Sequence, residues 1–277
     1  MTRRLRARGV FRGLAWIYGL AFIGFLLLPI LIVIPASITP TTVLKFPPDG
    51  FSLRWYEALA KQGMWQQSFV LSLQVALLAA VITVVCAVLL GVAHYRYGGV
   101  SAWTRVLTML PLLVPGVVVA TGLFAVLLQL DALGDPLVLA IVQSAIAMPV
   151  VSAMLLSAFD SLGRSLWFAA SSLGARARTI ILRLLVPEIL VPVVAAFVLA
   201  FSTAFDEVTF AVFLGVPTLP SRMFAFMQLQ ADPVLAAVAS VLFFIAVGGT
   251  GVSALLMGAR RAQRRRRALL AAGSASS

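Results

Sequence analysis

Residues 68–93 read SFVLSLQVALLAAVITVVCAVLLGVA and contain no charged side chain. A helix needs about 20 mostly apolar residues to cross the hydrocarbon core of a bilayer, and this stretch is long enough. The rest of the chain has the same character, since 62% of its 277 residues are hydrophobic and only 11% are charged. Soluble domains average about half apolar and about a quarter charged residues. The sequence therefore predicts an all-α membrane protein.

Six apolar stretches are long enough to span a membrane, and they cover residues 14–36, 68–93, 103–128, 137–159, 188–214 and 234–257. The first follows the basic segment RRLRAR, so a signal peptide is an alternative reading. Its apolar run exceeds the ~7 to 15 residues of a signal peptide's hydrophobic region, and we therefore interpret it as a retained helix.

The placement of basic residues predicts the orientation of these spans. Of the 21 Lys and Arg residues, 17 fall at the N-terminus, in the loops after the second and fourth spans, and at the C-terminus. Lys and Arg beside spans are retained in the cytoplasm, so both termini are expected there. This predicts a basic N-terminus (1–13), a periplasmic segment (37–67), a five-helix core (68–257) and a disordered basic tail (258–277).

The basic tail carries the run RRAQRRRR directly after the last span. A nucleic-acid tail is the alternative reading of such a run. Topology and attraction to anionic lipid headgroups explain it adequately, so the expected partner is the lipid bilayer and no nucleic acid.

The cytoplasmic loop 159–187 ends in FAASSLGARARTIILRLLVP, which occupies residues 168–187. Ser165–Leu173 is compatible with a helix, and Gly174 suits a left-handed C-terminal cap because it has no Cβ atom. A second helix is expected over Ala175–Val186. Pro187 would then open the fifth span at a first-turn position, where its missing N–H group costs nothing.

This loop resembles the "EAA" loop in the membrane subunits of binding-protein-dependent ABC importers. The positions that match the family pattern are Ala169, Ala170, Gly174 and Pro187. Two positions depart from it, since Phe168 stands where the family usually has Glu and Val186 where it usually has Leu. The resemblance implies the type I ABC importer permease fold, with six spans and both termini in the cytoplasm.

In that family the loop forms a coupling helix that docks into a cytoplasmic ABC ATPase. The resemblance therefore implies that Phe168 and Trp167 supply apolar docking contacts in place of the missing Glu. Arg176, Arg178 and Arg183 would flank the docking helix, with a role as topology anchors as their alternative, and Ala175 belongs to the same coupling loop. The alternative is an amphipathic helix that lies on the lipid surface.

Within the family, the likeness is closest to polyamine (spermidine/putrescine) permeases. It rests on FPPDGFSLRWYEAL, MLPLLVPGVVVATGLF, FDE and PTLPSRMF. Permeases for ferric iron or aminophosphonates are the alternatives. The resemblance implies a multi-pass protein of the bacterial inner membrane, which works with a cytoplasmic ATPase dimer, a second homologous permease and a periplasmic solute-binding protein.

Two adjacent carboxylates, Asp206 and Glu207, follow Phe205 in the otherwise apolar fifth span. Carboxylates in a span usually face a bundle interior or a water-filled cavity, and paired acids attract a cation. We therefore predict that they line the substrate pathway, together with Phe205. The alternative is that the helix ends near Phe205 and the acids are solvated or cap a turn. Gln129 and Gln143 are uncharged pathway candidates, with interhelical hydrogen bonding as their alternative role.

Pro111, Pro115 and Gly116 are predicted helix hinges in the third span, because each proline removes a backbone hydrogen bond. Such kinks are also common as plain packing features. The sequence offers no nucleophile–base pair, no metal-ligand cluster and no Walker A spacing, so ATP and any catalysis are expected in a partner subunit. An ion-coupled carrier is the main alternative, and an intramembrane enzyme would require catalytic side chains that the spans lack.

Overall fold

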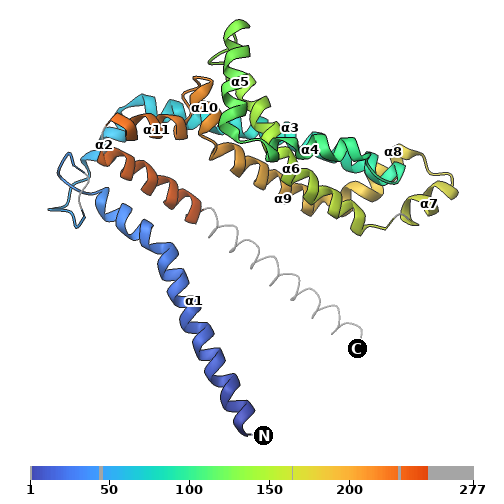
Figure 1. Cartoon of the computed structure of the whole chain (residues 1–277), viewed down its shortest axis with the longest axis horizontal. Helices are drawn as coiled ribbons and strands as arrows, with labels where there is room; N and C mark the ends of the chain where they lie inside the picture. Colours follow the sequence, from blue (N-terminus) through green and yellow to red (C-terminus); the bar gives the residue numbers. More distant parts are fainter. Residues whose placement is uncertain (1, 44–45, 164, 230–231, 249–277) are drawn as a thin grey trace, which may run out of the picture. The chain divides into compact units, whose positions relative to one another are not determined.

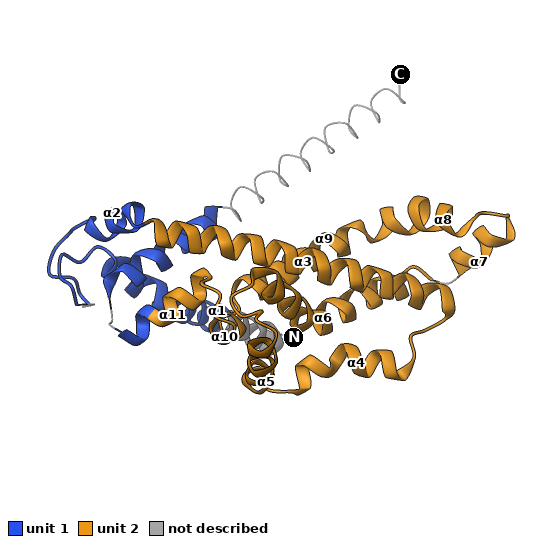
Figure 2. Cartoon of the chain, turned by 90° about the horizontal axis from the view of Figure 1, so that it is seen from above, with its two compact units in different colours: residues 1–62, 226–277 blue, residues 63–225 orange. Residues whose placement is uncertain are grey.

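The computed structural model describes residues 2–43, 46–163, 165–229 and 232–248, and all regular secondary structure in these ranges is helical (Figure 1). The chain divides into two compact units. One consists of residues 1–62 and 226–277, and the other of residues 63–225 (Figure 2). Each unit is described by itself below.

Four helical segments are long and apolar enough to cross a membrane, and they cover Trp16–Ala36, Gly63–Tyr97, Pro136–Ser161 and Ala177–Phe205. A bent pair of helices, Ala102–Leu113 and Gly116–Gln129, counts as a fifth if the pair forms one broken span. A shorter apolar helix covers Pro233–Gly248. Within the described residues, the prediction of an all-α chain with several spanning helices is confirmed.

The unit of residues 63–225 is built around three long helices: α3 (Gly63–Tyr97), α6 (Pro136–Ser161) and α9 (Val186–Phe205). The fully buried residues where they meet are mostly small: Ala76, Ala79, Ala80, Ala87, Ala140, Ala147, Ala196 and Ala200. Small side chains let helix backbones approach closely, which is the usual packing mode in membranes. Midway along these helices, a hydrogen bond crosses from α3 to α6, from Thr83 Oγ1 to the Ser144 carbonyl oxygen at 3.1 Å.

The predicted third span is not one straight helix. It consists of α4 (Ala102–Leu113) and α5 (Gly116–Gln129), which meet at an angle of 96°. Val114 between them is extended, with φ −103° and ψ 130°. The ring of the following Pro115 disfavours helical geometry at the preceding residue, which explains the break at this point.

The predicted fifth span also ends early. Helix α9 stops at Phe205, and two short helices follow, α10 (Thr209–Phe213) and α11 (Leu219–Leu229). The N-terminus of α11 is tied to α3, because the Leu219 N–H donates to Ser72 Oγ at 2.7 Å and Arg222 Nε donates to Ser68 Oγ at 2.6 Å. The end of the predicted sixth span and the predicted tail 258–277 lie outside the described residues.

The other unit contains α1 (Thr2–Ala36) and the short helix α2 (Arg54–Lys61). Two aromatic residues of α2 hold the segment that follows α1. Trp55 Nε1 donates to the Thr39 carbonyl oxygen at 2.8 Å, and the Tyr56 hydroxyl lies 2.7 Å from Ser37 Oγ. These hydrogen bonds satisfy the polar tips of both rings within the unit.

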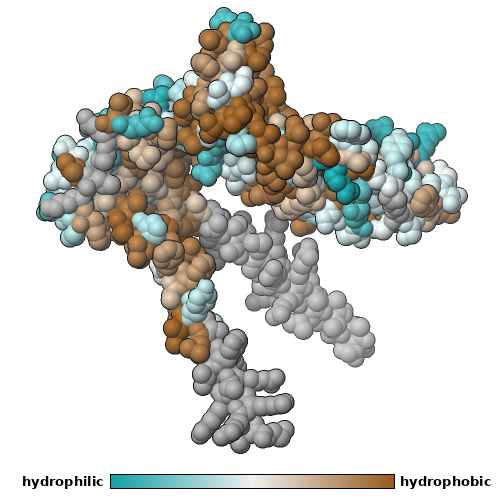
Figure 3. Space-filling view, viewed as in Figure 1, coloured by the Kyte–Doolittle hydropathy of each residue, from teal (hydrophilic) through white to brown (hydrophobic). Residues whose placement is uncertain are grey.

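Apolar side chains cover much of the visible surface of the unit 63–225, including α5 (Figure 3). The exposed apolar residues of α3, α5 and α9 include Val81, Val85, Leu89, Val117, Val118, Val191, Val194 and Val198. Soluble monomers rarely expose apolar patches of this extent, so these faces are suited to lipid or to another membrane-embedded protein.

Candidate functional site

The loop after α6 begins with helix α7 (Ser165–Ser172), which ends in a glycine-capped turn. Gly174 has φ +79°, the left-handed conformation that favours a residue without Cβ. The Ala175 N–H donates to the Ala170 carbonyl oxygen at 3.1 Å, and the Gly174 N–H donates to the Ser171 carbonyl oxygen at 3.0 Å. This pair of bonds is the Schellman motif, which satisfies the carbonyl groups left over at a helix C-terminus.

Helix α7 has an inward and an outward side. Ala170 and Ala175 pack against a buried cluster of Tyr95, Phe159, Ile180, Leu185 and Ile189. Phe168 and Leu173 point away, with 63% and 88% of their surfaces exposed, and Ala169 is also exposed. The "EAA" residues are thus divided between holding the loop to the bundle and presenting a surface outward.

Trp167 does not share the outward position predicted for it together with Phe168. Its ring meets the Tyr95 ring edge-on, with 6.3 Å between the centroids, and it packs against the buried cluster of this loop. Only Phe168 of the two offers its ring to a partner. Successive residues of a helix point about 100° apart, which separates these neighbours onto different sides.

The second half of the loop differs from the prediction in its details. Ala175 and Arg176 are not helical. Instead, Arg176 is extended at the N-terminus of α8 (Ala177–Thr179), and its side chain is exposed. A π-helical turn, η1 (Ile180–Leu185), then leads directly into α9, where Pro187 occupies the first turn. The Val186 N–H accordingly donates to the Ile181 carbonyl oxygen, five residues back. The wider turn removes the clash between a proline ring and the carbonyl group four residues earlier.

The adjacent carboxylates Asp206 and Glu207 have different environments. Glu207 caps α10, because its Oε1 accepts the Thr209 N–H at 2.8 Å and its Oε2 accepts the Phe210 N–H at 2.9 Å. Asp206 is exposed at the C-terminus of α9, and among the described residues no hydrogen bond or ion pair engages its carboxylate. Of the two carboxylates, Asp206 is the one whose oxygens accept no hydrogen bond within the described residues.

Phe205, which directly precedes these acids, packs against aromatic residues of α9 and α3. Its ring stacks on Phe201, with 5.7 Å between the centroids, and meets the Phe69 ring of α3 edge-on at 6.3 Å. The exposed Asp206 thus lies next to the point where α9 contacts the first turns of α3.

The two predicted glutamines are placed differently from each other. Gln129 ends α5 and is exposed, whereas Gln143 of α6 is only 1% exposed. Neither amide atom of Gln143 has a hydrogen-bond partner among the described residues. Leaving a buried polar group unpaired costs about 1–3 kcal/mol. In this conformation Gln143 belongs to the helix packing and does not line an open path.

Pro111, Pro115 and Gly116 gather at the bend between α4 and α5. Pro111 lies inside α4, Pro115 is the residue before α5, and Gly116 begins α5. Phe210 of α10 is the nearest neighbour to Gly116, since a Cβ atom added to this glycine would lie 3.7 Å from the Phe210 ring. The bend is therefore adjacent to the short helix that Glu207 caps.

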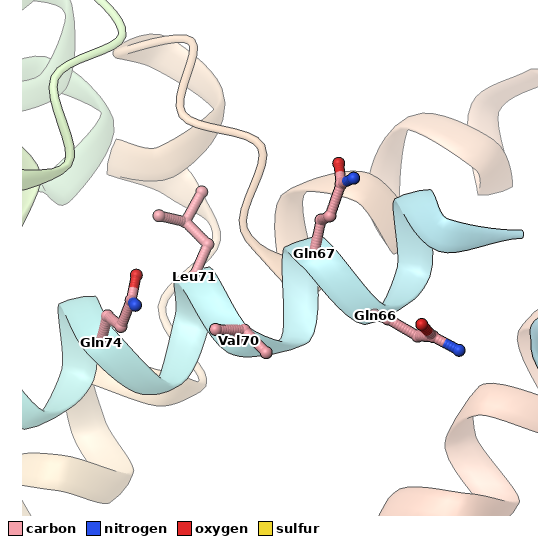
Figure 4. Close-up of a pocket in the computed structure, with 5 residues that line it drawn as sticks. All are labelled: Gln66, Gln67, Val70, Leu71 and Gln74. Atoms are coloured by element: carbon pink, nitrogen blue, oxygen red, sulfur yellow. The ribbon is translucent and has the colours of Figure 1, made fainter.

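A shallow groove on α3 was missed at the level of sequence. It has a volume of about 470 Å³ and is lined by Gln66, Gln67, Val70, Leu71 and Gln74 (Figure 4). Gln67, Leu71 and Gln74 point to one side of the helix and Gln66 to the other. The signal was present as three glutamines within nine residues at the start of an apolar span. Exposed amides are disfavoured in lipid, so this face is suited to water or protein.

Spanning apolar helices with a short two-sided helical loop define the chain as a multi-pass membrane permease. It belongs to the family described as "Binding-protein-dependent transport system inner membrane component", whose model matches residues 83–267, more than half of the chain. The resemblance seen in the loop is thereby confirmed. The protein is an inner-membrane transport component and not an enzyme.

Similar proteins include the spermidine/putrescine transport system permease protein PotC of Haemophilus influenzae, which is 26% identical over 75% of this chain and 82% of its own length. The putrescine transport system permease protein PotI of Escherichia coli is 27% identical over 78% of this chain and 80% of its own. PotC of Escherichia coli is 24% identical over 82% and 87%, respectively.

Proposed function

We propose that this chain is a permease subunit of an ABC importer for polyamines or similar small organic cations. The observation that carries the substrate class is the similarity to permeases named for spermidine and putrescine, which extends over three quarters or more of the chain. Asp206 supports it chemically, because an exposed carboxylate with no partner among the described residues attracts an ammonium group. Ferric iron and aminophosphonates are the alternative substrates.

The proposal includes six spans, with both termini in the cytoplasm. The supporting observation is that 17 of the 21 basic residues fall on one side of the predicted topology. Helix α7 then lies on the cytoplasmic side, where a partner ATPase dimer binds and hydrolyses ATP. A second homologous permease completes the pathway, and a periplasmic binding protein delivers the solute.

Docking to the ATPase is proposed to use apolar contacts at the position where the family usually carries Glu. The exposed ring of Phe168 on α7 and the exposed side chain of Leu173 in the turn that follows form the outward side of this loop. Burying a large apolar side chain contributes about 1.5–3 kcal/mol, so burial of these two residues would favour docking.

The pathway is proposed to pass Asp206 and to be gated at the bend near Pro115. Glu207 is assigned a structural role in this scheme, because both of its carboxylate oxygens already accept backbone N–H groups. Gln129 is retained as an exposed candidate contact, and Gln143 would become one only if the packing of α6 opens.

Reconstitution in proteoliposomes tests the proposal. The permease pair, the ATPase and the binding protein would be assembled, and ATP hydrolysis would be compared with the binding protein empty, loaded with spermidine or loaded with putrescine. Stimulation by a polyamine-loaded binding protein, with uptake of the same polyamine, is expected. If ATP hydrolysis is stimulated only by a binding protein loaded with ferric iron or an aminophosphonate, that solute would replace polyamines as the proposed substrate. Uptake driven by an ion gradient without ATP would refute the ABC importer reading.

A further inference from the structure

Two polar contacts join the cytoplasmic end of α3 to the start of the coupling loop. His94 Nε2 donates to Asp160 Oδ1 at 2.7 Å, and the Tyr95 hydroxyl donates to the Gly163 carbonyl oxygen at 2.6 Å. The partners are 66 and 68 residues apart in the sequence. Both contacts therefore cross between helices at the point where α6 ends and the loop begins.

Aromatic contacts continue the same connection into α7. The Tyr95 ring lies 6.1 Å from the Phe159 ring and 6.3 Å from the Trp167 ring, measured between centroids. The Arg96 guanidinium carbon lies 6.0 Å from the centre of the Trp167 ring. Tyr95 thus touches the last turn of α6 with one part of its ring and the first turn of α7 with another.

The link between α6 and α7 is short and contains Gly163, whose backbone dihedrals can change at little cost. Gly163 has φ +67°, which is accessible to glycine at little cost. A glycine link without further support would let α7 rotate relative to α6. The Tyr95 hydroxyl holds the carbonyl group of this same glycine, and Trp167 is held on the far side of the link.

We propose that His94 and Tyr95 are positioning residues for coupling, and that they make α3, α6 and α7 move as one body. This inference rests on the proposed docking of α7 to an ATPase. When the ATPase displaces α7, the His94–Asp160 and Tyr95–Gly163 contacts transmit the displacement to the spanning helices. Without them, the Gly163 link absorbs the movement, and ATP is hydrolysed with less transport.

Burial explains why these contacts are suited to transmission. The side chain of His94 is 9% exposed and that of Asp160 is 63% exposed, so the imidazole is fixed in the helix packing while the carboxylate reaches it from the surface. A hydrogen bond to a charged group is roughly twice as strong as a neutral one. This contact joins the end of α3 to the end of α6, directly before the loop begins.

The test uses two variants that leave the packing intact. Tyr95→Phe removes one hydrogen bond, and Asp160→Asn keeps an acceptor for His94 but removes the charge from the other hydrogen bond. Tyr97→Phe is the matched control. It also removes a tyrosine hydroxyl, but from a side chain that is exposed and lies two residues after Tyr95. Each variant would be assembled with the ATPase and binding protein in proteoliposomes. The readouts are ATPase co-purified, ATP hydrolysed and substrate transported.

We expect Tyr95→Phe and Asp160→Asn to keep the ATPase bound but to lower transport per ATP by about two- to tenfold. This is the effect of losing one net hydrogen bond in the first variant and of weakening a charged one to a neutral one in the second. Tyr97→Phe is expected to match the wild type. His94→Gln, whose amide can still donate toward Asp160, is expected to retain more coupling than His94→Ala.

Two results would overturn the inference. One is wild-type transport per ATP in both Tyr95→Phe and Asp160→Asn. The other is a loss of transport that follows a loss of assembled complex, which would mean that the contacts only stabilise the fold. A failure of the wild-type chain itself to bind an ATPase would refute the proposed function instead, so the two failures are distinguishable.

Discussion

Replacing Gly91 by alanine is expected to destabilise the bundle. A Cβ atom at this position of α3 would overlap the ring of Phe159, with Cε2 and Cδ2 as the nearest atoms. Phe159 is fully buried, so its ring has no free space into which it could move. Glycine is needed here for the close approach of α3 to α6.

The magnitude follows from two opposing effects. Inserting a methyl group into a packed core costs about 1–3 kcal/mol. Alanine recovers about 1 kcal/mol of helix propensity relative to glycine. Gly122 of α5 is the matched control, because a Cβ atom there would meet nothing within 4 Å. We therefore expect the free energy of unfolding of Gly91→Ala to lie about 1–3 kcal/mol below that of Gly122→Ala.

The assay is thermal unfolding of the detergent-solubilised permease, followed for Gly91→Ala, Gly122→Ala, Phe159→Leu and the double variant of Gly91→Ala with Phe159→Leu. The smaller leucine is expected to relieve the overlap, so the double variant should be more stable than the sum of the two single effects implies. Equal stability of Gly91→Ala and Gly122→Ala would refute the close approach of α3 to α6 at Phe159.

Three further predictions concern the loop and the pathway. Gly174→Ala places a Cβ atom on a residue with φ +79°, which is expected to cost about 1–2 kcal/mol in loop stability. Less ATPase should then co-purify with the permease, and unchanged co-purification would count against a role of this turn in docking. Phe168→Glu is expected to weaken ATPase binding, and tighter binding would show that docking uses charge. Asp206→Asn is expected to lower polyamine uptake without changing the melting temperature, whereas Glu207→Gln is expected to lower stability by about 1 kcal/mol through the cap of α10. The opposite pattern in the two acids would reverse their assigned roles.

Hydropathy predicted most of the spanning helices because the length of an apolar run is a local property. It missed the break within the third span and the early end of the fifth for a physical reason. Val114 and Val208 are apolar and continue the run, but Pro115 forces the residue before it out of the helix, and Glu207 starts a new helix by accepting two N–H groups. Apolar composition and helical continuity are separate properties. A hydropathy average over a window of residues reports the composition and does not detect a break in the helix.

The loop was recognisable from its glycine and small residues, but its two sides were not. Trp167 and Phe168 are both apolar, and only the position of Tyr95 on a distant helix decides that Trp167 faces inward. His94 is likewise a lone histidine directly after an apolar stretch, and nothing in the sequence assigns it a partner. Its contact with Asp160 joins residues on two different helices, and one sequence contains no signal for such pairings.

The packing of this unit suggests where movement during transport is concentrated. Helices α3, α6 and α9 meet through alanines, with one hydrogen bond from Thr83 to the Ser144 carbonyl oxygen, and the contacts of His94 and Tyr95 hold the loop end of α3. Close backbone packing leaves little room for these helices to slide. The α4–α5 junction differs, because Pro111 and Pro115 each lack a backbone N–H donor. The chain bends there by 96° between α4 and α5. A helix changes direction at low cost where its hydrogen bonds are already missing. Opening and closing should therefore change the angle at Pro115 more than the spacing between α3 and α6.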